Sequence, residues 1–162
     1  NSNDPDLYVI VAELLRKGIN KDRIYAQVCN TNTSKRLRLN GYSIYKKMQL
    51  FPEHQAALIT LTRDELKEFD YDKGDTESLV NVPLSIPGIS YSVFMRDDTK
   101  YIKVSSRSKG DFPVNRICEK YFNGGGHKNA AGGEFRGSLT EAVNVFLSIL
   151  DENDKYLQKT TK

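Results

Sequence analysis

Helical periodicity dominates the first third of the chain. Apolar positions recur at helical spacing over residues 5–18, after an Asp-Pro start signal and up to a terminal glycine. The same reasoning predicts a second helix over about residues 20–28 and a third over about residues 34–50. No strand is predicted here for these helices to cover. We therefore interpret residues 1–50 as helices that belong to a larger unit.

The pattern changes after Pro52 to short apolar runs separated by turn signals. An apolar run at 56–61 predicts a buried strand, and Thr62 and Glu65 form a capping box that opens a helix. The remaining predicted elements are a helix at 78–85 that Pro83 shortens or kinks, strands at 89–95, 100–107 and 134–136, and helices at 113–122 and 139–150. Ser138 and Glu141 form a second capping box before the last of these helices. This order predicts an α/β fold with a mixed sheet packed by helices.

These elements divide the chain into four parts. We expect a helical segment at 1–50, a linker at 51–55, an α/β domain at 56–150 and a polar tail at 151–162.

Composition excludes several classes of protein. Hydrophobic residues make up 38% and charged residues 28% of the 162 residues, which is enough apolar material for a packed core and excludes general disorder. No apolar run approaches the roughly 20 residues of a membrane span, and residues 1–6 are polar. The two cysteines, Cys29 and Cys118, form neither a disulfide framework nor a zinc motif. We expect free, buried thiols in a cytoplasmic protein with no membrane partner.

The net charge of +3 says little, but its distribution says more. Basic residues are in local surplus between residues 96 and 128, beside a glycine-rich segment. They are Arg96, Lys100, Lys103, Arg107, Lys109, Arg116, Lys120 and Lys128. This arrangement suits an anionic ligand better than an even scatter would, but charge alone favours a solvated face.

The strongest local signal is the segment 124–133, which holds five glycines and one histidine. Consecutive glycines such as Gly124, Gly125 and Gly126 let backbone N–H groups approach an anion closely. His127 could donate a hydrogen bond to a phosphate oxygen. Two interpretations remain open: a phosphate site, or a tight structural turn between a helix and a strand.

The strand predicted at 100–107 offers a second cluster of candidates. On an extended segment Lys103, Ser105 and Arg107 share one face, while Ile102 and Val104 point to the other. A guanidinium suits a two-point phosphate contact better than an ammonium does, so Arg107 is a stronger candidate than Lys103. The alternative is an exposed strand face with no ligand.

Three segments then resemble one family, in the order that the family has them. Residues 124–132 read GGGHKNAAG, similar to the GGGHxxAAG signature of the DHH-associated domain. Residues 74–77 and 81–84 resemble the GDTE…N-x-P-L segment of NrnA-type oligoribonuclease/pAp phosphatases, and residues 103–108 resemble their K-V-S-x-R-S strand. The DHH-associated domain is the C-terminal half of many DHH-family phosphoesterases, RecJ nucleases among them.

The resemblance covers about residues 56–150, and residues 1–50 are similar to the end of a DHH domain and its connecting helix. In this family the DHH half binds two divalent metals, usually manganese, through residues that include an Asp-His-His triplet. This chain has no such triplet and only two histidines. We therefore expect no catalytic residue and no metal ligand here, and no activity from this chain alone.

The resemblance also implies roles for individual residues. His127 with the glycines at 124–126 would hold a phosphate or the sugar of the substrate, and Arg107 would bind a neighbouring phosphate. Lys103 and Ser105 accompany Arg107, and Glu77 is a weaker candidate for ligand contact, while its neighbours at 75 and 76 are expected to cap the next helix.

The implied function is the substrate-binding half of a phosphodiesterase acting on short oligoribonucleotides or pAp-like nucleotides. Its partners would be that substrate and its own DHH domain, and a homo-oligomer is possible. Two alternatives stay open: an exopolyphosphatase-like phosphoesterase, and a non-catalytic nucleic-acid-binding or dimerisation module of the kind found in alanyl-tRNA synthetases.

Overall fold

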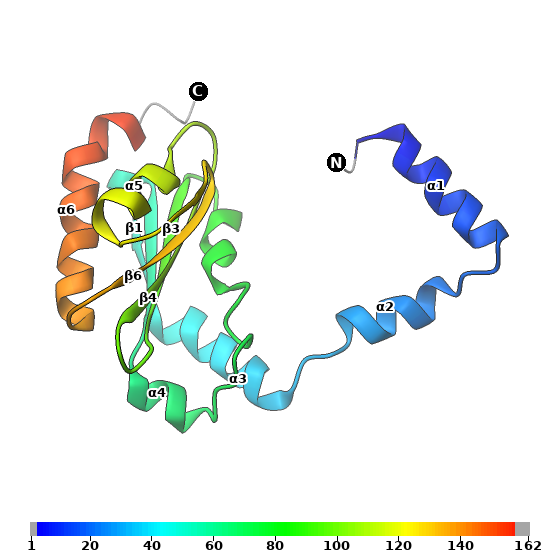
Figure 1. The fold of residues 1–162 in the computed structure, drawn as a ribbon, viewed down its shortest axis with the longest axis horizontal. Helices are drawn as coiled ribbons and strands as arrows, with labels where there is room; N and C mark the ends of the chain where they lie inside the picture. Colours follow the sequence, from blue (N-terminus) through cyan, green and yellow to red (C-terminus); the bar gives the residue numbers. More distant parts are fainter. Residues whose placement is uncertain (1–2, 158–162) are drawn as a thin grey trace. The chain divides into compact units, whose positions relative to one another are not determined.

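The computed structural model describes residues 3–157 and divides the chain into two compact units, residues 1–34 and residues 35–162 (Figure 1). The first unit contains α1 (Pro5–Arg16) and α2 (Lys21–Cys29). Both begin as the sequence predicts, because Asp4 accepts a hydrogen bond from the Asp6 amide and Asn20 accepts one from the Arg23 amide. Neither helix contains a buried residue.

The second unit is built on a six-stranded sheet with the order β1-β2-β3-β4-β6-β5. The strands are β1 (Met48–Phe51), β2 (Ala56–Leu61), β3 (Tyr91–Asp97), β4 (Ile102–Ser108), β5 (Gly125–His127) and β6 (Ala130–Phe135). Only β2 and β3 are parallel; every other pair is antiparallel. The predicted α/β fold with a mixed sheet is confirmed.

Helices cover both faces of this sheet, so it separates two hydrophobic cores (Figure 1). The larger core lies under α5 (Val114–Tyr121) and α6 (Leu139–Leu157), where Val114, Ile117, Phe146 and Ile149 meet Tyr91, Val93 and Val104. The smaller core lies under α3 (Ser34–Tyr42), α4 (Arg63–Glu68) and the 3-10 segment η3 (Leu79–Ser85), where Leu39, Leu66 and Leu79 meet Ile59 and Phe94.

The third predicted helix is correct at its start and wrong at its end. Instead of continuing to Leu50, α3 gives way to the π-helical segment η1 (Ser43–Lys47), and the chain then extends into β1. β1 pairs antiparallel with β2 along its whole length, from Met48 opposite Ile59 to Phe51 opposite Ala56. Hydrogen bonds to a neighbouring strand outweigh the local helical spacing here, so the sheet begins before the predicted linker.

The glycine-rich segment also differs from expectation. Between α5 and α6 the chain forms a hairpin of β5 and β6, in which His127 faces Ala130 and Gly125 faces Gly132. The predicted short strand at 134–136 is the end of β6, which begins at Ala130.

Helix ends follow the predicted capping residues in two places. Thr62 and Glu65 form the full capping box at the start of α4, and Ser138 and Glu141 exchange the same pair of bonds before α6. α6 runs on to Leu157, into the predicted polar tail, and the rest of that tail lies outside the described residues. Among residues 3–157, no helix is both long and apolar enough to cross a bilayer.

Candidate anion-binding face

Strand β4 separates buried from half-exposed side chains in strict alternation. Ile102, Val104, Ser106 and Ser108 are buried, whereas Lys103, Ser105 and Arg107 are partly exposed on the opposite face of the sheet. The predicted alternation is therefore confirmed: two cations and a hydroxyl stand on one face of a strand whose other face lies in the core.

Strand register brings the candidates from different motifs into one row. Arg107 on β4 lies opposite Ser92 on β3 and opposite Ala130 on β6, and Ala130 in turn lies opposite His127 on β5. Directly opposed residues on antiparallel strands point to the same face. Arg107 and His127 thus lie on the same face of the sheet, with only Ala130 between them.

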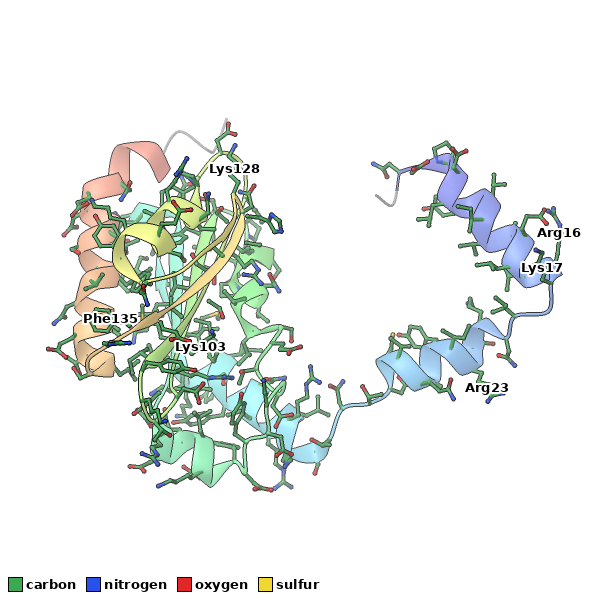
Figure 2. All side chains as sticks on the ribbon, viewed as in Figure 1. Arg16, Lys17, Arg23, Lys103, Lys128 and Phe135 are labelled. Atoms are coloured by element: carbon green, nitrogen blue, oxygen red, sulfur yellow. The ribbon has the colours of Figure 1, made fainter. Side chains whose placement is uncertain are left out.

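The rows beside this one continue the same face. Ser105 lies between Phe94 and Gly132, and the next row holds Arg96, Lys103 and Glu134. Because Gly132 has no side chain and that of Ala130 is small, β6 covers little of the sheet surface beside β4. Figure 2 shows the length of this face, with Lys103 near one end of β4 and Lys128 at the turn of the β5–β6 hairpin.

Arg107 is held by backbone atoms. Its Nη1 donates to the carbonyl oxygens of Ser106 at 2.9 Å and of Ala131 at 3.3 Å. No described carboxylate forms an ion pair with it, and no described residue accepts from its Nε or Nη2. The guanidinium is oriented but its charge is not neutralised, which is the state that favours binding of an external anion.

His127 is exposed at the edge strand, and within the described part of the chain nothing bonds to its ring. The turn that follows it is well fixed. The side-chain amide of Asn129 donates to Ser108 Oγ and to the Gly110 carbonyl, both at 2.9 Å, and Lys128 Nζ lies 2.6 Å from Asp111 Oδ1. The edge position of His127 is therefore set by contacts to the β4–α5 connection.

The three glycines of the signature have different reasons to be glycine. A Cβ at Gly124 would lie 2.0 Å from the Gly132 carbonyl oxygen, and one at Gly126, where φ is +142°, would lie 2.7 Å from that of Ala130. Gly125 has no such constraint, because its nearest neighbour would be Glu119 Cγ at 3.8 Å. Close packing therefore requires glycine at positions 124 and 126. Among these three positions, packing would allow a side chain only at position 125.

A pocket of about 210 Å³ opens on the same face, at the end away from Arg107. It brings together three predicted site residues, Glu77, Lys103 and Ser105. The other lining residues are Lys73, Gly74, Thr76, Phe94 and Arg96. Arg107 and the glycine hairpin do not line it.

Arg96 is the residue of this pocket that sequence analysis did not single out. Its side chain is 15% exposed and sits in a network: Nη2 lies 3.2 Å from Asp98 Oδ2, and Nη1 donates to Thr76 Oγ1 at 3.3 Å and to the Tyr71 hydroxyl. Its Nε is buried and has no hydrogen-bond partner among the described residues. The only available signal was its place in the local basic surplus, since no motif includes it.

The segment before η3 does not cap that helix as expected. Asp75 Oδ2 accepts from the Asp72 amide at 2.9 Å, Thr76 accepts from Arg96, and η3 has no side-chain cap at Ser78. The Asp75 carboxylate thus fixes the loop and the Thr76 hydroxyl contacts Arg96, because the chain makes three turns before η3 starts. Glu77 is left exposed at the pocket rim.

A metal centre does not fit the residues that the structure describes. Within 3–157 no group of three or more His, Cys, Asp or Glu side chains is placed to hold a metal ion. We assign no step on this face to a metal.

The fold and the face together define an α/β domain that carries a strand face with cationic side chains and an edge glycine hairpin. A sequence profile of the DHHA1 domain matches residues 54–154, which is more than half of the chain, and the chain belongs to this family.

Two relatives support this assignment. The bifunctional oligoribonuclease and PAP phosphatase NrnA of Bacillus subtilis is 32% identical over 120 residues, which are 74% of this chain and 37% of that protein. An exopolyphosphatase-related protein from Bacteroides fragilis has a crystal structure that matches with a TM-score of 0.92 and 50% identity, over 97% of this chain and 46% of that one. This chain thus spans less than half of either relative.

A third solved structure shares the fold alone. The pGpG-specific phosphodiesterase PggH from Vibrio cholerae matches with a TM-score of 0.53 at 13% identity, over 78% of this chain and 40% of that one.

Proposed function

We propose that this domain is the substrate-binding half of a DHH-family phosphodiesterase that hydrolyses short oligoribonucleotides or pAp-like nucleotides. The observation that carries the proposal is the row formed by Arg107 and His127 across β4, β6 and β5. Arg107 is oriented by two backbone carbonyls and has no acidic partner in the described chain. A phosphate on this row would neutralise that cation and accept a hydrogen bond from the histidine.

The role of this half is positioning and charge neutralisation. A phosphodiester held on a fixed row of donors is presented to the catalytic groups in one orientation, and its negative charge is compensated before attack. The catalytic groups and the divalent metals, manganese in our expectation, belong to a DHH half that this chain does not include. By this proposal the chain alone binds substrate and hydrolyses none.

A second candidate is an exopolyphosphatase-like phosphoesterase. The similarity to the exopolyphosphatase-related protein from Bacteroides fragilis favours it, and a row of phosphate-binding side chains would accept polyphosphate as readily as a nucleotide. The two candidates differ in whether anything on the face contacts a base.

Calorimetric titration tests the proposal with pAp, a dinucleotide and tripolyphosphate as ligands. We expect the parent chain to bind the nucleotides, and Arg107→Ala and His127→Ala to weaken binding strongly. Arg116→Ala is the matched control, because Arg116 is an exposed arginine on α5 that pairs with Glu119 at 3.2 Å on the other side of the sheet. Unchanged affinity in Arg107→Ala and His127→Ala would contradict the proposal.

Activity assays test the expectation that this chain alone hydrolyses no substrate. The purified chain with manganese should release no phosphate or mononucleotide from pAp or from a dinucleotide. Turnover that stays constant per mole of protein across preparations would show that this half carries catalytic groups of its own.

A further inference from the structure

We propose that the 210 Å³ pocket between the loop at 73–77 and strands β3 and β4 is a nucleobase subsite. This inference rests on the proposed function, because it assigns the base of a nucleotide whose phosphate lies on the Arg107 row. It places the two parts of the ligand at opposite ends of one strand face.

Charge compensation distinguishes the two ends. In the pocket Arg96 Nη2 lies 3.2 Å from Asp98, and Lys103 Nζ lies 3.9 Å from Glu134. A third cation, Lys73, shares the rim with the Glu77 carboxylate. Two of the three cations in the pocket are thus paired with acids outside it, whereas Arg107 has no acidic partner among the described residues, so a phosphate is attracted to the Arg107 end and an uncharged polar group suits the pocket.

The groups that line the pocket match the edge of a base. The Ser105 hydroxyl can donate or accept, the Glu77 carboxylate accepts, and the Lys73 and Lys103 ammonium groups and the Arg96 guanidinium are donors. Bases present ring-nitrogen or carbonyl acceptors beside amino donors, and arginine and carboxylate side chains are the usual partners of these two kinds of group. Phe94 adds an apolar surface for the ring.

The spacing along β4 suits one nucleotide. Arg107 and Lys103 are four residues apart on an extended strand, which corresponds to about 13 Å between their Cα atoms. Ser105 lies halfway, opposite Gly132, whose missing side chain leaves the middle of the face low enough for a sugar. Phosphate, ribose and base then follow one another along the strand.

The subsite also separates the two candidate substrates. A nucleotide fills both ends of the face, whereas a fully ionised polyphosphate has no hydrogen-bond donor to offer the Glu77 carboxylate. The pocket therefore favours a nucleotide substrate.

The test compares AMP and GMP with ribose 5-phosphate, which keeps the phosphate and sugar and lacks the base. We expect at least one of the two nucleotides to bind the full chain about tenfold more tightly than ribose 5-phosphate. Glu77→Gln should reduce that ratio and leave the affinity for ribose 5-phosphate unchanged. Glu68→Gln is the matched control, since Glu68 is an exposed glutamate on the neighbouring helix α4.

Amide chemical shifts give an independent measurement. The amides of Gly74 and Thr76 should move with AMP or GMP and stay in place with ribose 5-phosphate, while those at 125–127 should respond to all three ligands. Equal affinities for the nucleotides and ribose 5-phosphate, with no shift at Gly74 and Thr76, would overturn the base subsite and leave the phosphate row standing.

The two proposals fail in different ways. If Arg107→Ala leaves ribose 5-phosphate binding unchanged, the phosphate row is wrong, although a base-dependent gain that Glu77→Gln removes would still support the pocket. If none of these ligands binds the chain at millimolar concentration, both proposals are overturned.

Discussion

Arg107 donates a hydrogen bond from Nη1 to the carbonyl of Ala131 at 3.3 Å, which joins the K-V-S-x-R-S strand to the glycine-rich signature. These two residues, 24 positions apart in the sequence, therefore belong to one structure. The bond fixes the direction of the guanidinium without reducing its charge, because a carbonyl is neutral. The guanidinium is therefore preorganised, with its charge intact, for the anion binding that we propose.

Replacement of Arg107 should reduce phosphate binding much more than stability. We expect Arg107→Ala to cost about 1.5–3 kcal/mol of binding free energy for pAp, because a charge-assisted hydrogen bond to the phosphate is lost. Arg107→Lys should recover little of this loss. A guanidinium can donate to backbone carbonyls and to a phosphate from different nitrogens of one plane, whereas an ammonium has a single nitrogen and cannot reproduce these contacts. Calorimetry of the three proteins measures both effects, and full recovery by lysine would mean that charge alone matters.

The glycine signature should separate into packing and ligand positions. Gly124→Ala should lower the free energy of unfolding by about 1–3 kcal/mol or more, because its Cβ would overlap the Gly132 carbonyl oxygen. Gly125→Ala has room and should change stability by less than about 1 kcal/mol. Urea denaturation compares the two variants.

Ligand affinity of the stable variant completes this test. We expect Gly125→Ala to bind pAp more weakly, because the added methyl group keeps a phosphate away from the backbone amides. Normal affinity in a folded Gly125→Ala protein would mean that the hairpin serves packing alone.

The sequence predicts those elements whose own side chains indicate the structure, through helix capping or through alternation of apolar and polar residues. The capping box of Thr62 and Glu65 identified the start of α4, and alternation on β4 identified the face of Arg107. The glycine hairpin could not be predicted as strands, because glycine and alanine show neither alternation nor β-propensity. β6 depends on pairing with β4, and β5 depends on pairing with β6. β1 was missed for a related reason: pairing with β2 decides its conformation.

The candidate site was predictable to the same degree. Motifs located Arg107, His127 and Glu77, but no motif includes Arg96, which reaches the pocket because β3 pairs with β4 so that it lies opposite Lys103. Which glycines packing requires also depends on neighbours remote in sequence, such as Gly132 beside Gly124. Tertiary register supplies this information, and local sequence does not.

The two cysteines should differ strongly in reactivity. Burial raises the pKa of Cys118 to about 11, as expected for a buried thiol. The prediction that Cys29 is also buried is wrong, because α2 has no buried residue and leaves this thiol exposed. Because the thiolate is the reactive form, we expect one thiol per folded chain to react quickly with a disulfide reagent at pH 8, and the second only after unfolding. Cys29→Ser should remove the fast reaction; two fast thiols in the folded parent would contradict the burial of Cys118.

Glu65 should make the protein sensitive to acid. Its partial burial opposes ionisation, but hydrogen bonds from Lys47 at 2.7 Å, from Tyr42 at 2.5 Å and from Thr62 outweigh this and lower its pKa from 4.5 to about 2. A carboxylate with a lowered folded pKa contributes stability that is complete above the unfolded pKa and is lost as the pH falls toward the folded pKa. The contribution should therefore disappear between about pH 4.5 and pH 2.

Comparison of Glu65→Gln with Glu68→Gln isolates this contribution, because Glu68 is an exposed glutamate of the same helix. At pH 7 we expect Glu65→Gln to lose stability on the order of 3 kcal/mol, the free energy that corresponds to its lowered pKa. The difference between parent and Glu65→Gln should shrink as the pH is lowered from 4.5, since the parent carboxylate then becomes neutral as well. Urea denaturation at a series of pH values measures it, and a difference that stays constant down to pH 2 would mean that glutamine disturbs packing and that the charge of Glu65 contributes nothing.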